Sequence, residues 1–465
     1  MLLDFSKLPE WQSDLIKEIN KYTLTTPDTM ILMILNVKAS QYLQIPRINI
    51  ISPEDNKITP CNYYGLLFSP SGSGKDRLTS SIDSLIFSGC KSIFNQKLQD
   101  YIEKQQKKID DEIEELKTNG AKDHYKLNNM PRRLSLSFSD GTPEGFISDR
   151  EAYKIAGWGG TTFINNELVN YLKQKDRAKS YLLSLIGECF DKGDNNAKTI
   201  KGNAICNSVE GVPSTLFASS SPSDIHKDNI HSQILESLNR QLARRSFICF
   251  PESDEFKQVG NDIESVKKHF KENKNDFVLE TYKNNFKKII QELLKQKEIN
   301  YKLSDEAENV YFKYYIDCNN RVGLYDGLNF DGLISEILGR PWKMLKLAGI
   351  LHSFKYNSYV QEISEDTINE AIYQTEFYGD YFMKFYKFDV ADEITTLYKY
   401  FTQNKNKEIS KKQIRELKIV NNNKFSKWFN DILIDLQDIA NNDGYIIDEI
   451  KGNKNTVYYV LKDIV

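Results

Sequence analysis

The chain lacks the features that mark secreted, membrane-spanning and zinc-stabilised proteins. Its six cysteines are scattered along 465 residues without the paired spacings of a zinc module or a disulfide framework. No apolar run approaches the length that spans a membrane, and the first residues lack the basic-then-apolar order of a signal peptide. We therefore expect a protein of the reducing cytoplasm, with no membrane partner.

The sequence also lacks a large excess of either positive or negative charge. The 62 basic and 65 acidic residues give a formal net charge of −3. Any contact with nucleic acid must therefore come from local basic patches. The sequence also shows no zinc motif or acidic cluster of the kind a primase needs for primer synthesis. Its length is enough for two or three domains with sizeable cores.

The most informative stretch that is present is residues 65–78, Gly-Leu-Leu-Phe-Ser-Pro-Ser-Gly-Ser-Gly-Lys-Asp-Arg-Leu. Residues 63–69 have the pattern of a buried strand and residues 76–87 that of an amphipathic helix, so Lys75 stands at a helix N-terminus, where anions bind. A P-loop has the pattern Gly-x4-Gly-Lys-Ser/Thr, whose amides and lysine hold phosphates and whose hydroxyl holds Mg²⁺. The predicted nucleotide contacts are Ser69, Ser71, Gly72, Ser73, Gly74, Lys75, Asp76 and Arg77.

Two positions depart from that pattern. Ser69 replaces the first glycine, and Asp76 replaces the hydroxyl residue. The second departure matters more, because a carboxylate beside the phosphates is either a direct ligand of Mg²⁺ or a repulsive charge. Ser/Gly-rich turns between a strand and a helix are also common without any ligand.

Further apolar runs predict a parallel sheet with crossover helices. With residues 63–69 they make five strands, the others being residues 134–139, 161–165, 214–220 and 246–250. Ligands gather at the carboxyl ends of such strands. Polar groups near these runs match the needs of an NTPase, namely a carboxylate, a polar side chain and an arginine. Taken singly, each is also typical of an ordinary loop, turn or surface pair.

Four regions are expected. Two helices fill an N-terminal extension, residues 1–45, the second beginning where Thr26 caps and Pro27 takes the first helical position. An α/β core follows at residues 46–255, with a long charged helix at residues 92–118. A helical subdomain and a winged helix follow at residues 256–388 and 392–465.

In their shared order, several segments resemble P-loop proteins of phages, plasmids and mobile elements that are primase-helicase-like, relatives of the additional-strand NTPases that include AAA+ proteins and hexameric replicative helicases. The resemblance runs from about residue 20 to about residue 385. The matching segments are residues 60–75, 140–146, 163–167, 212–222, 242–246 and 343–351.

The resemblance implies ATP and Mg²⁺ as ligands and a role for each matching residue. Lys75 would bind the β- and γ-phosphates, Glu167 would be the catalytic base and Ser220 the polar sensor. Arg244 or Arg245 would act at a subunit interface. Glu144 is a second candidate for the base, because RecA-like relatives carry theirs after the strand next to the P-loop strand.

One carboxylate differs from the family's pattern. Asn166 stands where a magnesium-binding aspartate would be, whereas Asp76 adds an acid in the loop. If Asp76 takes over metal coordination, the charge of the site stays about constant. A degenerate site that does not hydrolyse ATP is the alternative.

Three groups of basic residues are candidates for further contacts. Residues 194–206 read as a β-hairpin, and in several hexameric helicases such a hairpin lines the pore, so Lys198 and Lys201 are candidate DNA contacts; a solvated surface hairpin is the alternative. Lys343 or Lys346 could sense phosphate, although core packing is the preferred interpretation. The basic end of the winged helix is the third group, and its candidate DNA contacts are Lys411, Lys412, Arg415, Lys424 and Lys427. Such modules also bind proteins.

The leading hypothesis is an ATP-dependent DNA motor of a phage or mobile-element replication system, either a hexameric helicase or a helicase loader, with single-stranded or forked DNA and a primase or other replication proteins as partners. One alternative is a nucleotide-gated DNA-binding initiator or switch that does not unwind. Another is the ATPase subunit of an anti-phage defence complex.

Overall fold

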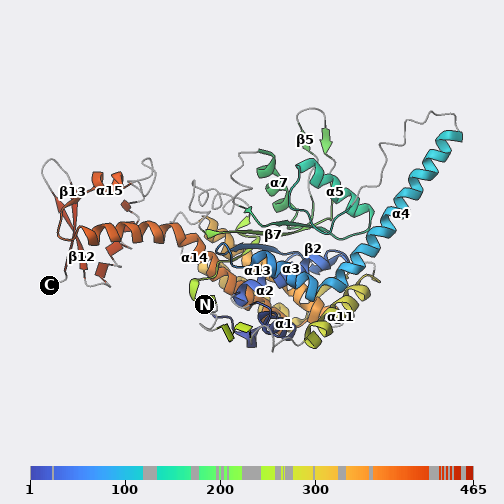
Figure 1. The fold of residues 1–465 in the computed structure, drawn as a ribbon, viewed down its shortest axis with the longest axis horizontal. Coiled ribbons are helices and arrows are strands. Elements are labelled where there is room, and N and C mark those ends of the chain that lie inside the picture. The colour runs from blue at the N-terminus through green and yellow to red at the C-terminus, as the bar shows by residue number, and fades with distance from the viewer. Residues whose placement is uncertain are drawn as a thin grey trace. The chain divides into compact units, whose positions relative to one another are not determined.

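The computed structural model of the chain divides it into two compact units, Met1–Phe382 and Met383–Val465 (Figure 1). Within the described residues, no helix has the length and apolar character needed to cross a membrane. The described residues are 2–23, 26–118, 134–168, 177–194, 198–200, 204–206, 209–222, 242–256, 263–264, 266–267, 276–296, 299–322, 331–355, 360–417, 429–430, 432–433, 436–437, 440–441, 445–451 and 457–463.

The first unit is built on a parallel four-stranded sheet in the order β4-β7-β3-β8. All three neighbouring pairs in this sheet are parallel, which places the four carboxyl ends at one edge. Its strands are β3 (Tyr64–Phe68), β4 (Thr161–Asn165), β7 (Ser214–Ser220) and β8 (Ser246–Cys249). These bounds match four of the five predicted runs to within one residue at each end.

The fifth predicted strand, residues 134–139, is not formed. Phe138 makes a single parallel bridge to Phe163 on β4, in which its amide donates to Thr162 and its carbonyl accepts from Ile164. Its ring packs edge-on against the ring of Phe163, 5.2 Å away. Phe138 therefore marks the outer edge of the sheet beyond β4 without extending it by a full strand.

Helices cover both faces of this sheet (Figure 1). On one face lie α5 (Pro143–Ile155) and α7 (Arg177–Glu188), and on the other α2 (Asp28–Leu43) and α3 (Lys75–Leu85). Nearly every residue of α2 is buried, the polar Asn36, Lys38 and Gln41 included. The second helix of the predicted N-terminal extension is thus buried within the first unit.

The cap predicted for α2 is wrong by one position. Pro27 is the N-cap residue, and no side chain caps the helix. The preceding helix is α1 (Glu10–Asn20). The long helix α4 (Ser88–Thr118) begins four residues earlier than predicted.

A second sheet has the order β10-β9-β1-β2. It joins β1 (Ile48–Ile51) and β2 (Ile58–Pro60) to β9 (Ile299–Leu303) and β10 (Glu362–Ile363). The region expected to be helical therefore also supplies two strands to this sheet. Its described helices are α11 (Asp276–Leu293), α12 (Asp305–Val322), α13 (Asp331–Lys355) and the start of α14 (Glu365–Gln403).

The predicted hairpin after α7 is present in the backbone. Its strands β5 (Lys198–Ile200) and β6 (Ala204–Cys206) pair antiparallel.

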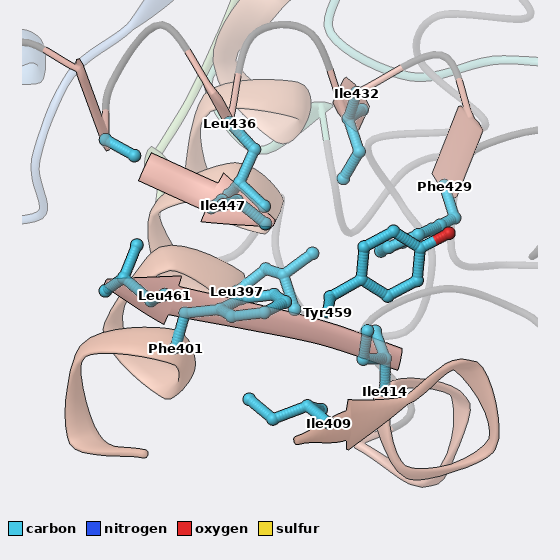
Figure 2. Packing of buried hydrophobic residues seen from close by; sticks show 11 residues of the cluster. Leu397, Phe401, Ile409, Ile414, Phe429, Ile432, Leu436, Ile447, Tyr459 and Leu461 are labelled. Atoms are coloured by element: carbon cyan, nitrogen blue, oxygen red, sulfur yellow. The ribbon is translucent and has the colours of Figure 1, made fainter. Parts of the chain in front are cut away.

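The second unit has its own apolar core (Figure 2). Its sheet, in the order β11-β13-β12, consists of β11 (Ile409–Ser410), β12 (Tyr445–Lys451) and β13 (Val457–Asp463). The short helix α15 (Lys411–Glu416) begins with a capping box between Ser410 and Gln413. Phe401 on α14, Ile414 on α15 and Leu461 on β13 meet in this core.

We predict that Gly349→Ala lowers the free energy of unfolding. Gly349 lies inside α13, where alanine is normally favoured by about 1 kcal/mol. Here the added Cβ would stand well inside the van der Waals distance of Cys61 Sγ. Overpacking of this kind costs about 1–3 kcal/mol.

The double variant Gly349→Ala/Cys61→Ala removes the clashing sulfur and should regain most of that loss in urea unfolding. If the double variant is no more stable than Gly349→Ala alone, the sulfur contact is not the cause.

Candidate functional site

The loop after β3 is shaped by two glycines and two serines. Gly72 and Gly74 have φ values of 80° and 79°, in the left-handed region that favours glycine. Ser69 is fully buried, and its Oγ lies 2.8 Å from Oγ of Ser73. Gly74 is the N-cap residue of α3, so the loop leads directly into a helix N-terminus. Free backbone amides at such a terminus favour anionic ligands.

Lys75 is the first residue of α3, and its ammonium group turns back toward the sheet. Nζ donates to the Ser69 carbonyl at 2.8 Å and to the Ser220 carbonyl at 3.4 Å. The Ser69 amide in turn donates to the same Ser220 carbonyl at 3.1 Å. The cation therefore sits between the carboxyl ends of β3 and β7.

The end of β4 presents an acid next to these groups. Asn165, at the last position of β4, accepts from the Glu167 amide at 2.9 Å and donates to the Ser139 carbonyl at 3.1 Å. This Asx turn fixes the backbone that carries Glu167. Ser219 Oγ also donates to the Asn166 carbonyl at 3.3 Å, which ties this turn to β7. Asn166 and Glu167 are both exposed.

These three strand ends surround one cavity of about 380 Å³. Its charged lining comprises two cations, Lys75 and Arg77, and two carboxylates, Asp76 and Glu167. Such a lining offers donors to anionic oxygens and carboxylate oxygens to a cation. Its full lining is Ser71, Gly72, Ser73, Gly74, Lys75, Asp76, Arg77, Asn166, Glu167, Ser220 and Ser221.

The structure thus brings together all but one of the predicted loop contacts, together with Asn166, Glu167 and Ser220. The exception, Ser69, lies beneath the loop. Ser221 and the positioning residue Asn165 were missed. Ser221 directly follows the predicted Ser220 in the sequence Ser219-Ser220-Ser221-Pro222, whereas nothing in the sequence distinguishes Asn165 from the asparagine that follows it. Glu144, in the first turn of α5, does not line this cavity.

Arg244 and Arg245 lie in a different cavity, of about 520 Å³. Arg245 is buried and donates to Asp191 at 2.6 Å, whereas Arg244 is half-exposed with its guanidinium 3.6 Å from the same carboxylate. Burial opposes ionisation of Asp191, but its hydrogen bond with Arg245 holds its pKa below the ordinary value. The predicted role at a subunit interface stays a prediction, and Arg244 is the more accessible of the two.

Lys343 and Lys346 are fully buried on α13, as the core-packing interpretation expects. Lys343 pairs with Glu336 at 2.8 Å and donates to the Ser246 carbonyl. Lys346 donates to oxygens of Pro60, Asn62 and Phe190 at 2.7–2.8 Å. Burial lowers the pKa of Lys346 to about 7.

The predicted nucleic-acid contacts are placed in part. Lys198 lies on β5, where the backbone alone is described, and Lys201, Lys424 and Lys427 lie outside the described residues. On α15, Lys412 and Arg415 are exposed. Lys411 is half-buried, with Nζ 3.3 Å from Asn430 Oδ1 and 5.4 Å from the centre of the Phe429 ring.

A scan against models of known protein families finds no match for this chain, and a search of curated proteins finds none either.

We predict that Gly74→Ala lowers the free energy of unfolding by about 1–2 kcal/mol, the cost of a left-handed backbone for a residue with a Cβ. Gly141→Ala is the matched control. An added Cβ meets no atom within 4 Å at either position, but Gly141 lacks the left-handed φ. Alanine at position 141 should be neutral or stabilising by up to about 1 kcal/mol. Equal effects of the two substitutions in urea unfolding would contradict the conformational explanation.

Proposed function

We propose that this chain is a P-loop NTPase that hydrolyses ATP with Mg²⁺, and that it is a DNA motor of a phage or mobile-element replication system, either a hexameric helicase or a helicase loader. The observation that carries the proposal is the cavity at the carboxyl edge of the parallel sheet. The 71–77 loop, the Asn166–Glu167 turn and the Ser220–Ser221 pair meet there, although they come from three separate strands.

The order of the strands supports this class. β7 lies between β3, which leads into the lysine-bearing loop, and β4, which leads to Glu167. A strand inserted between these two is the feature after which additional-strand NTPases are named. Ser220, at the end of that inserted strand, faces the cavity from between the loop and the acid.

The proposed reaction assigns each group a task. Lys75 exchanges its carbonyl partners for the β- and γ-phosphate oxygens of ATP, assisted by loop amides. A water held near Glu167 attacks the γ-phosphorus and gives up a proton to Glu167. The bond between the γ-phosphorus and the β,γ-bridging oxygen breaks, and ADP and inorganic phosphate leave. Ser220 or Ser221 donates a hydrogen bond that orients this water or a γ-phosphate oxygen.

The donor set fits Mg²⁺. This cation takes oxygen ligands and is usually bound by one or two carboxylates together with substrate phosphates. Where side chains are described, no group of three or more His, Cys, Asp or Glu residues could enclose a metal alone. Asp76, directly or through water, and Asn166 would hold the ion, which would neutralise charge on the phosphates.

A DNA-dependent, ring-shaped motor extends this proposal. Arg244 does not line the ATP cavity, yet its side chain is 54% exposed. If it stabilises the transferring phosphoryl group, it must do so from a neighbouring subunit. The β5–β6 hairpin and the exposed cations of α15 are the proposed contacts with DNA phosphates.

One observation favours the switch as a second candidate. The loop carries Asp76 where a P-loop has a hydroxyl, and Asn166 lacks the carboxylate of a metal-binding aspartate. A site that binds ATP but hydrolyses it slowly would suit a nucleotide-gated DNA-binding protein. Unwinding distinguishes the two candidates.

We expect Lys75→Ala to abolish Mg²⁺-dependent ATP hydrolysis and Glu167→Gln to reduce it by about 10²–10⁴-fold while retaining ATP binding, because the amide cannot accept the proton. Glu144→Gln is the matched control and should hydrolyse ATP like the wild type. ATP turnover and unwinding of a forked duplex are the measurements.

Hydrolysis by Lys75→Ala at the wild-type rate would refute the NTPase proposal. Hydrolysis without unwinding would favour the switch. Loss of activity in Glu144→Gln but not in Glu167→Gln would identify the other acid as the base.

We also expect Asp76→Ala to raise the Mg²⁺ concentration for half-maximal hydrolysis by about 10–100-fold, as loss of a metal-site partner does. The double variant Asp76→Ser/Asn166→Asp moves the carboxylate to the position that it has in the P-loop family that the sequence resembles. It should recover most of the lost Mg²⁺ affinity. If Asp76→Ala alone hydrolyses ATP like the wild type, Asp76 has no part in metal binding.

A further inference from the structure

A second cavity, of about 450 Å³, lies between α4 and the C-terminal end of α5. Figure 1 shows α4 running past that end of α5. The cavity is far along α5 from Thr142, which caps the opposite end of the helix. Trp158, which lines this cavity, lies just before Thr161, the first residue of β4. The cavity therefore lies near the N-terminal end of that strand. It is therefore distinct from the cavity at the carboxyl edge.

Lysines dominate the rim of this groove. Lys97, Lys104, Lys107 and Lys108 line it against two acids, Asp100 and Asp111. Lys97, Lys104 and Lys108 recur at intervals of seven and four residues, which places them on one face of α4. Two other acids of α4 lie outside this lining, and each accepts a hydrogen bond from a glutamine four residues earlier: Glu103 from Gln99 and Asp110 from Gln106. The groove thus has a net positive lining on a helix that carries many acids.

The floor of the groove is apolar. Trp158 is almost fully buried and packs on Phe94 and Tyr153, with ring centroids 4.8 and 5.2 Å away. Ile155, by contrast, is 66% exposed beside the lysines. An apolar floor below a cationic rim suits a ligand that carries flat apolar groups along a chain of negative charges.

We propose that this groove is a binding site for a single strand of nucleic acid, held by its phosphates on α4. The choice of nucleic acid over an acidic protein segment rests on the proposed function. At 1.5 Å per residue, Lys97 and Lys108 are about 16 Å apart along the helix axis. That distance is about five times the 3.4 Å spacing of phosphates along one strand of a duplex, so several phosphates of a single strand can lie along it.

A bound anion would stabilise the charged form of the groove lysines. Burial lowers the pKa of Lys97, and the neighbouring Lys104 cation lowers it further, against the opposing effect of Asp100. Phosphate oxygens bound between these lysines would offset both effects. The expected signature is strong salt dependence, because bound lysines release counterions from the strand.

The test is fluorescence anisotropy of a labelled 20-nucleotide oligothymidylate with the full chain, without ATP, over a series of salt concentrations. In Lys97→Gln/Lys104→Gln/Lys108→Gln we expect binding at low salt to weaken by about tenfold or more. The slope of log affinity against log salt should fall in magnitude by about two, that is, about 0.7 for each of three phosphates.

Two further variants control this result. Lys267→Gln/Lys295→Gln/Lys302→Gln removes the same charge from exposed surface ion pairs elsewhere and should bind like the wild type. Replacement of the three groove lysines by arginine keeps the charge and should retain binding. Thermal unfolding of each variant establishes that it is folded.

Three outcomes would overturn the proposal: wild-type affinity and slope in the folded glutamine variant, an equal loss in the surface-lysine control, or displacement of the oligonucleotide by polyglutamate as readily as by unlabelled DNA. The last would point to an acidic protein segment. Because binding is measured without ATP, these results are independent of ATP hydrolysis. A chain that binds DNA through the groove but hydrolyses no ATP would refute the proposed function alone.

Discussion

The parallel pairing of β3 with β7 is the constraint on which the candidate site depends. The register sets Phe68 opposite Ser220, so the loop after β3 and the serines after β7 emerge side by side. The Ser220 carbonyl then accepts hydrogen bonds from both the Ser69 amide and the Lys75 ammonium group. A slip of one residue would turn every side chain of β7 to the opposite face and separate these groups. The cavity therefore depends on the register of β3 and β7 more than on any single side chain.

Buried lysine and arginine side chains connect other parts of the first unit to this sheet. Lys346 on α13 joins Pro60 and Asn62, just before β3, to Phe190, just after α7. Next to it, Asp191 holds Arg245 at the start of β8. Burying a charge without partners costs several kcal/mol, so each contact in this network depends on the others. Helices α7 and α13, distant in sequence, are thereby held to the strands that carry the candidate site.

Much of the candidate site could be predicted, because strands of the parallel core are continuous apolar runs and polar residues follow them directly. The loop residues 71–77, Glu167 and Ser220 were found in this way. Local patterns could not reveal partners that are distant in sequence. The short strand β9 pairs with β1, some 250 residues away in the sequence. Because that partner is so distant, the local pattern gave no sign of the strand, and the region was predicted to be helical. Residues 134–139 had a strand's composition, but only Phe138 pairs with β4. The role of Asn165 depends on where its amide points, which composition does not encode.

The carbonyl partners of Lys75 make ligand entry an exchange and not a simple addition. An incoming group must replace two hydrogen bonds that the ammonium already makes to Ser69 and Ser220. A neutral ligand would offer no better acceptor than those carbonyls, whereas an anionic oxygen would add the attraction between opposite charges to the hydrogen bond. If the site binds ATP as proposed, the hydrogen bonds within the loop therefore favour anionic ligands over uncharged molecules of the same shape.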